Sequence, residues 1–267
     1  MITKRHLIVF LAFREIDVIK KSFESIEHVS SDIFVIENKS ENSPEIEEYF
    51  KTKLGSLIGY IQFNKNTENS SIPLFNRAYR DLIESYEYIT YTDGDLYAYD
   101  AEEMFKEILE AFKNPRVMVS SSTVWRDNFP FINSKEYKKL IKANVVSDNL
   151  LPLENRKTLE DFINEQKINT RPFGSKDSPV TLSTGHFFVT YKNKDLKHIF
   201  EIPIYTDSYI YQKVKELNKE WHITTKNISY HMSWDLYYTG SPYYNWKKEK
   251  RETIWKHIIE SDFRVIL

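Results

Sequence analysis

The first hundred residues alternate between short apolar segments and amphipathic segments, and this alternation restricts the fold more than any other feature. Four segments have the apolar, β-branched and aromatic composition of buried strands, at 6–13, 32–37, 57–63 and 87–92. Three intervening segments carry apolar residues at helical spacing, within 14–29, 42–54 and 72–85. Strand–helix units with short connections predict an α/β fold, with a mostly parallel sheet covered by helices on both faces.

The second half of the chain has a looser pattern. A helix is expected at 100–112 and a strand at 116–124, and regular signals then return with strand 181–190, helix 208–221 and strand 222–232. No internal repeat or low-complexity linker divides the chain. We therefore expect a single domain with a variable second half.

Composition excludes several classes of protein. Lys and Arg number 37 against 39 Asp and Glu, so we expect no nucleic-acid partner. The absence of cysteine excludes thiol catalysis, disulfides and thiolate zinc sites. The apolar run from Leu7 to Phe13 is shorter than a membrane span and has no signal-peptide cleavage site. We expect a cytoplasmic protein.

Two aspartates follow the fourth predicted strand directly, as Asp93-Gly94-Asp95. Ligands of open parallel sheets bind at the carboxyl ends of the strands, where this acidic turn is expected. Mg²⁺ or Mn²⁺ would relieve the repulsion between two close carboxylates, and Gly94 would allow a close approach of backbone to ligand. The alternative is a solvated turn, because Asp and Gly are common turn residues.

Other phosphate-binding motifs are missing or misplaced. A phosphatase with an aspartyl nucleophile needs its acidic pair after the first strand and Gly-Thr after the second Asp, whereas Leu96-Tyr97 stands here. The chain contains no Gly-x-Gly-x-x-Gly after the first strand and no Gly-Lys-Ser/Thr loop. Any bound phosphate would therefore be held by a metal ion and side chains.

Seven segments carry a resemblance through their order along the chain. They are "IVFLAFREIDVIKKSFESI", "IFVIENKSENSPEI", "NSSIPLFNRAYRDLIES", "YITYTDGDL", "STGHFFVT", "YTDSYIYQKV" and "ISYHMSW". In this order they resemble the GT-A fold glycosyltransferases with a DxD motif, particularly the large inverting family of bacterial polysaccharide and lipopolysaccharide enzymes. The resemblance covers most of the chain and implies a GT-A-like, Rossmann-type sheet.

The resemblance also implies one domain, 1–267, with three parts of different function. Residues 1–115 would bind the nucleotide sugar, 116–235 would form the acceptor side, and 236–267 would form a lid and an amphipathic helix. The implied reaction is transfer from a UDP- or GDP-linked sugar to a glycan or lipid-linked glycan, with Mn²⁺ or Mg²⁺ as cofactor. Two alternatives remain, a sugar nucleotidyltransferase and a non-catalytic sugar- or nucleotide-binding protein.

Three residues are implied for the metal site. Asp95 would bind the ion directly, and Asp93 would bind the donor ribose, or the ion through water. His231 would complete the metal shell; the alternative is a strand-end histidine packed beside Tyr230 and Trp234.

Asp207 is implied as the general base that deprotonates the acceptor hydroxyl. The family often has an acidic residue before the base, where Thr206 stands here. Alternatively, Asp207 and Ser208 cap the following helix. In that case Glu201 or an acid in the variable region would serve as base, or the enzyme would retain configuration.

The remaining implied contacts belong to donor and acceptor. The donor side comprises Phe13, Arg14, Glu37, Asn69, Asn76, Arg77 and Gly94. The acceptor side comprises Thr184, Gly185, His186 and Trp125. Arg77 can equally be a solvent-facing helix residue, and Trp125 a core tryptophan.

The carboxyl-terminal segment has three interpretations. It could close over the donor, with Lys247 or Lys248 at the diphosphate, or it could contact an anionic membrane through Trp246, Trp255 and nearby basic residues. The ordinary alternative is a solvated helix face.

Overall fold

The computed structural model describes residues 4–67, 70–98, 100–125, 188–200, 207–231 and 263–267. Its first half contains, in chain order, β1 Lys4–Ala12, α1 Ile16–Glu24, β2 Asp32–Glu37, α2 Ser43–Lys51, β3 Gly59–Phe63, α3 Ser71–Ala78, α4 Arg80–Glu84, β4 Tyr86–Asp93, β5 Leu96–Ala98 and α5 Ala101–Glu110. The elements that follow are β6 Val117–Trp125, β7 Val189–Lys192, α8 Asn193–Phe200, α9 Asp207–Glu216, β8 Glu220–His231 and β9 Phe263–Val265. The strand–helix alternation predicted for the first half is confirmed.

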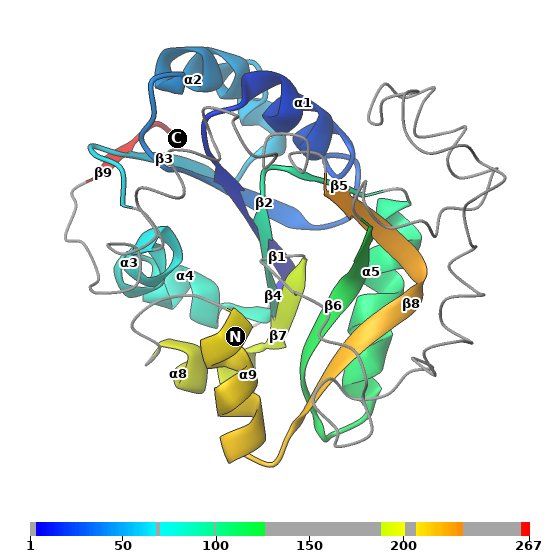
Figure 1. Cartoon of the computed structure of the whole chain (residues 1–267). Helices are drawn as coiled ribbons and strands as arrows, with labels where there is room; N and C mark the ends of the chain where they lie inside the picture. The colour runs from blue at the N-terminus through cyan, green and yellow to red at the C-terminus, as the bar shows by residue number, and fades with distance from the viewer. Residues whose placement is uncertain (1–3, 68–69, 99, 126–187, 201–206, 232–262) are drawn as a thin grey trace, which may run out of the picture.

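All described strands form one sheet, in the order β5-β8-β6-β7-β4-β1-β2-β3-β9. Strands β3, β2, β1 and β4 are mutually parallel, as predicted, and β6 pairs with β8 in parallel. Strands β5, β7 and β9 join in antiparallel orientation. The carboxyl ends of the first four strands therefore meet at one edge of the sheet (Figure 1).

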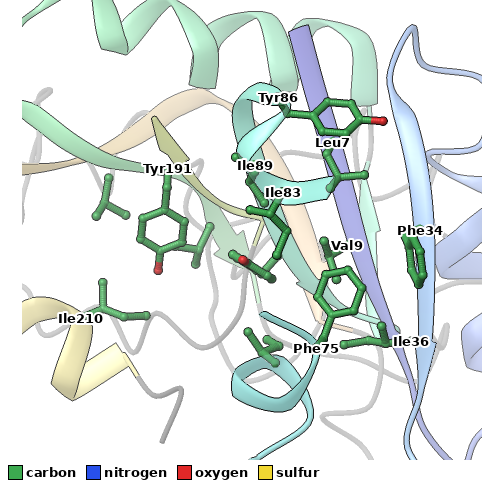
Figure 2. Packing of buried hydrophobic residues seen from close by; sticks show 14 of the residues in the cluster. Leu7, Val9, Phe34, Ile36, Phe75, Ile83, Tyr86, Ile89, Tyr191 and Ile210 are labelled. Atoms are coloured by element: carbon green, nitrogen blue, oxygen red, sulfur yellow. The ribbon is translucent and has the colours of Figure 1, made fainter. Parts of the chain in front are cut away.

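Helices cover both faces of the sheet, and each face has its own hydrophobic cluster (Figure 1). On one face, α3, α4 and α9 pack through Phe75, Ile83 and Ile210. Figure 2 shows Phe75 beside Ile36 and Val9 of the sheet in this cluster. The other face is covered by α1, α2 and α5. The α/β/α layers follow from strands that are apolar on both faces.

The helix predicted over 72–85 is two helices. Tyr79 separates α3 from α4, with φ −116° and ψ 30°, outside the helical region. Its ring stacks on Phe75 with centroids 5.1 Å apart and packs edge-on against Phe34 at 5.0 Å. These aromatic contacts accompany the break, which the helical spacing of apolar residues did not reveal.

Strands β5 and β9 and helix α8 were not predicted. The helix expected around Trp255 lies outside the described residues, but within the segment assigned to lid and helix, Phe263–Val265 form a strand instead. Arg264 of β9 donates from Nε to Gln62 Oε1 of β3 at 3.0 Å, and the Ile266 amide donates to the Tyr60 carbonyl at 2.7 Å. The end of the described chain thus belongs to the sheet.

A buried histidine links β1 to β4. His6 is 4% exposed; its Nε2 lies 2.7 Å from Thr90 Oγ1, and its Nδ1 lies 2.8 Å from Ser31 Oγ. Burial, with a smaller contribution from the Arg5 charge, lowers the pKa of His6 from 6.5 to about 3. The folded protein therefore holds a neutral imidazole at physiological pH.

We expect His6 to make the protein less stable in mild acid. Below pH 6.5 the unfolded chain binds a proton that the folded chain does not, so the free energy of unfolding falls as pH falls towards 3. The slope from this one group is at most about 1.4 kcal/mol per pH unit. Urea titrations between pH 7 and 4.5 give the free energy of unfolding of the wild type and of His6→Gln. Its dependence on pH should be steeper in the wild type by up to this slope. His28→Gln, at an exposed histidine, is the control, and equal slopes in the wild type and His6→Gln would contradict the prediction.

Candidate functional site

Strand register brings the predicted site segments together at the carboxyl edge. Asp93 at the end of β4 pairs with Leu11 of β1, and Glu37 at the end of β2 pairs with Ala12. The acidic turn and the ends of β1 and β2 are therefore neighbours in the sheet, as the sequence predicted. This edge is the usual ligand site of such sheets.

The acidic turn is held closely against β1. The Gly94 amide donates to the Leu11 carbonyl at 2.8 Å. A Cβ on Gly94 would lie 2.8 Å from that carbonyl oxygen and 3.3 Å from the Phe10 ring. Glycine is therefore needed here for packing within the chain, a reason different from the predicted approach of a ligand. Asp93 and Asp95 are both half-buried.

The late histidine belongs to a strand that pairs beside the acidic turn. His231 is the last residue of β8, and its partner in the antiparallel β5–β8 register is Leu96, the residue after Asp95. Trp125, the last residue of β6, pairs with the neighbouring Tyr230. The backbones of His231 and Trp125 thus lie near the turn, whereas their side chains are outside the described part of the structure.

The chain turns sharply after β1, at predicted donor-side residues. Arg14 has a φ of 64°, and the Glu15 amide donates to the Phe13 carbonyl at 3.0 Å, which closes a strained three-residue γ-turn. Asn42 Nδ2 donates to the Arg14 carbonyl at 2.7 Å, and the Arg14 guanidinium pairs with Glu41. Strained backbone conformations gather at functional sites, which favours a binding role for this turn.

Glu37 lies beneath the surface. Its side chain is fully buried, and Oε2 accepts hydrogen bonds from the Tyr60 hydroxyl and from Gln62 Nε2 at 2.9 Å. Burial raises the pKa of Glu37, although hydrogen bonds from Ser43, Tyr60 and Gln62 act in the opposite direction. In this packing the carboxylate faces Tyr60 and Gln62 rather than solvent. A contact between Glu37 and a nucleotide stays a prediction.

The two predicted donor-side residues of α3 differ in exposure. Asn76 is 4% exposed, and its Oδ1 accepts a hydrogen bond of 2.6 Å from the Tyr91 hydroxyl. This bond joins α3 to β4 two residues before Asp93. Arg77 is exposed, consistent with the solvent-facing alternative. Donor contacts by Asn76 and Arg77 stay predictions.

Asn38 and Thr67 organise the same edge and were given no role by the sequence patterns. The backbone amide of Asn38 donates to the Ala12 carbonyl at 2.9 Å. The side-chain oxygen Oδ1 of Asn38 accepts from the backbone amide of Thr67 at 2.8 Å. Thr67 Oγ1 lies 2.6 Å from Ser71 Oγ at the start of α3. An asparagine directly after a buried strand was the available signal, since such side chains bond nearby backbone.

Several predicted residues cannot be compared with the structure. Asn69, Thr184, Gly185 and His186 lie outside the described residues. Asp207 is described only through its backbone, at the first residue of α9. Among the helices that are described, none is long and apolar enough to cross a membrane.

The carboxylates of the acidic turn suit a hard divalent cation. Carboxylate oxygens are the ligands that Mg²⁺ and Mn²⁺ prefer. No group of three or more His, Asp or Glu side chains arranged for a metal occurs among the side chains described, which do not include that of His231. The described part of the site therefore offers two candidate ligands, Asp93 and Asp95.

Comparison with known sequences gives distant relatives. No protein-family model matches the chain. It is 24% identical to "Uncharacterized protein L138" and 29% identical to "Uncharacterized protein L142", both from Acanthamoeba polyphaga mimivirus. These matches cover 96% and 92% of this chain but only 27% and 46% of the two relatives. The chain thus spans less than half the length of either relative.

Comparison with solved structures identifies the fold. S. aureus TarS residues 1–349, in complex with UDP-GlcNAc, superpose with a TM-score of 0.52 at 12% identity, over 96% of this chain and 68% of that one. A longer S. aureus TarS chain gives 0.50 at 13% identity, over 96% of this chain and 40% of that one. The predicted GT-A-like α/β fold class is confirmed.

Proposed function

We propose that this chain is a metal-dependent glycosyltransferase. It moves a sugar from a UDP- or GDP-linked donor to a hydroxyl of a glycan or lipid-linked glycan, with inversion at the anomeric carbon. The observation that carries the proposal is the acidic turn 93–95 at the carboxyl edge of the parallel strands, beside the His231 end of β8. The presence of UDP-GlcNAc in TarS, which has the same fold, supports the donor class.

The chemistry needs stabilisation of a leaving group. Breaking the bond between sugar and diphosphate leaves negative charge on the diphosphate, and Mn²⁺ or Mg²⁺ supplies compensating positive charge. Asp95 is proposed to bind the ion directly and His231 to complete its shell. Asp93 is proposed to bind the donor ribose, or the ion through a water molecule.

The other roles are assigned around this centre. Phe13 and Arg14 hold the base and ribose at the strained turn, and Asp207 takes the proton from the acceptor hydroxyl. Thr184-Gly185-His186 and Trp125 are proposed to contact the acceptor. For a lipid-linked acceptor, the basic segment around Trp246 and Trp255 would contact the inner membrane surface.

A panel of UDP- and GDP-linked sugars, scored by thermal shift with and without Mn²⁺, tests the proposal. A ligand at 100 times its dissociation constant stabilises the folded state by about 2.7 kcal/mol, and each kcal/mol raises Tm by roughly 2–4 °C at this size. We expect one nucleotide series to raise Tm only with Mn²⁺. Mn²⁺ alone and free UDP and GDP are the controls.

The products of the reaction separate the proposal from its alternatives. Transfer to an acceptor releases a nucleoside diphosphate, whereas a sugar nucleotidyltransferase consumes or releases pyrophosphate. Detection of pyrophosphate exchange would contradict the proposal. Donor binding without diphosphate release, over a panel of glycan acceptors, would favour a non-catalytic binding protein.

A further inference from the structure

Strand β5 lies at the edge of the described sheet, yet two of its outer backbone groups are hydrogen-bonded to side chains. The Ser22 hydroxyl donates to the Leu96 carbonyl at 2.6 Å, and the Ala98 amide donates to Ser25 Oγ at 3.0 Å. Ser25 Oγ donates its own proton to the Ser22 carbonyl at 2.7 Å. Both serines are buried at the carboxyl end of α1. The side chain of Ser22 in α1 and that of Ser25, which directly follows α1, therefore occupy the place of a further strand.

Strand β5 is hydrogen-bonded along both of its long sides. On one edge β5 pairs with β8, with Leu96 opposite His231 and Ala98 opposite Ser229. On the other edge the serines bond to the same two residues of β5. A strand of three residues has few ladder bonds of its own, so the serine contacts are a large part of what fixes its position.

The acidic turn leads directly into β5, which begins at Leu96. Asp95 lies between two anchors, the hydrogen bond from Gly94 to the Leu11 carbonyl and the hydrogen bond from Ser22 to the Leu96 carbonyl. A shift of β5 by one residue would turn its side chains to opposite faces and change which residue stands opposite His231. The serine contacts therefore act on the geometry between Asp95 and the end of β8.

We propose that Ser22 and Ser25 are positioning residues for the metal site, which set the place of Asp95 relative to His231 by fixing β5. This inference rests on the proposed function, because it assumes that the acidic turn binds a divalent ion. Neither serine contacts the ion or the donor; both act through the backbone of β5. Partners of this kind, one step removed from the ligands, commonly change metal affinity.

The test uses the full chain with Ser22→Ala, Ser25→Ala and the double variant. Binding of Mn²⁺ alone is measured from the free-ion signal in electron paramagnetic resonance, and hydrogen exchange of the Ala98 amide reports on β5. We expect the double variant to bind Mn²⁺ about tenfold more weakly, at the low end of the 10–100-fold range for such partners, with faster Ala98 exchange. Ser25→Thr keeps the oxygen that accepts from Ala98 and should restore wild-type affinity.

A matched control separates positioning from a general loss of stability. Ser85 Oγ donates to the Leu82 carbonyl at 2.6 Å, at the opposite end of β4, so Ser85→Ala removes a similar bond far from the acidic turn. Equal Mn²⁺ affinity in Ser85→Ala and the double variant, with Ala98 exchange accelerated only in the latter, would overturn the proposal. Absence of Mn²⁺ binding by the wild type would overturn the proposed function instead, and Ala98 exchange would still decide whether the serines hold β5.

Discussion

An Asp95→Asn variant is expected to lose Mn²⁺-dependent donor binding by at least about 100-fold while keeping its fold. Asparagine preserves the size of the side chain but removes the negative charge that a hard cation requires. Even partners of metal ligands change affinity by 10–100-fold, so loss of a ligand should exceed that range. Calorimetric titration of the donor, with and without Mn²⁺, measures the effect.

Asp100→Asn provides the matched control for this prediction. Asp100 is exposed, and its Oδ1 accepts a hydrogen bond of 3.2 Å from the Glu103 amide, capping α5. Asparagine caps a helix about as well as aspartate, so this variant loses one carboxylate near the turn without losing structure. Wild-type donor affinity is expected for Asp100→Asn. Wild-type affinity in Asp95→Asn would exclude Asp95 as a ligand.

The sequence predicted the central strands well because their burial on both faces leaves a clear signal. The bounds of β2 are those predicted, and β1, β3 and β4 differ by no more than two residues at either end. Continuous apolar runs separated by amphipathic helices are typical of a parallel sheet. The position of the acidic turn at the carboxyl edge followed from this pattern alone.

The two strands that the sequence did not predict depend on contacts between distant segments. Strand β5 is held by serines at the end of α1 about seventy residues earlier, and β9 by Gln62 and Tyr60 of β3. Each of these strands has three residues, too few for a pattern of period two to stand out. Their hydrogen-bond partners, rather than their own sequence, define them.

The positions of individual site residues also depend on contacts that local sequence does not reveal. The strand pattern placed Glu37 near the carboxyl edge, and the resemblance implied Asn76 on the donor side, but neither could show that each meets a buried tyrosine. Tyr60 donates to Glu37, and Tyr91 donates to Asn76 at 2.6 Å. A polar residue near the carboxyl edge can face a ligand or a neighbouring side chain, and local sequence does not distinguish the two.

An Asp207→Asn variant is expected to lose transfer while it retains donor binding and stability. A general base typically accelerates a reaction by 10²–10⁴-fold, so we expect a loss of that order in kcat with little change in the donor dissociation constant. Asp207 is the first residue of α9, and Ile210 of that helix packs in the core, so stabilisation of the helix start by the carboxylate is the competing explanation. The rate is measured as diphosphate release with the acceptor saturating.

Asparagine separates the two roles. It keeps a polar side chain of the same size at the helix start, so the variant loses chiefly the charge, which there is worth about 0.3–1 kcal/mol. Asp207→Ala removes both, and should lower Tm as well as kcat. A lost rate at nearly unchanged Tm in Asp207→Asn would then follow from the missing carboxylate. A wild-type rate would assign Asp207 to the helix alone and direct the search for the base to Glu201, or to a mechanism that retains configuration.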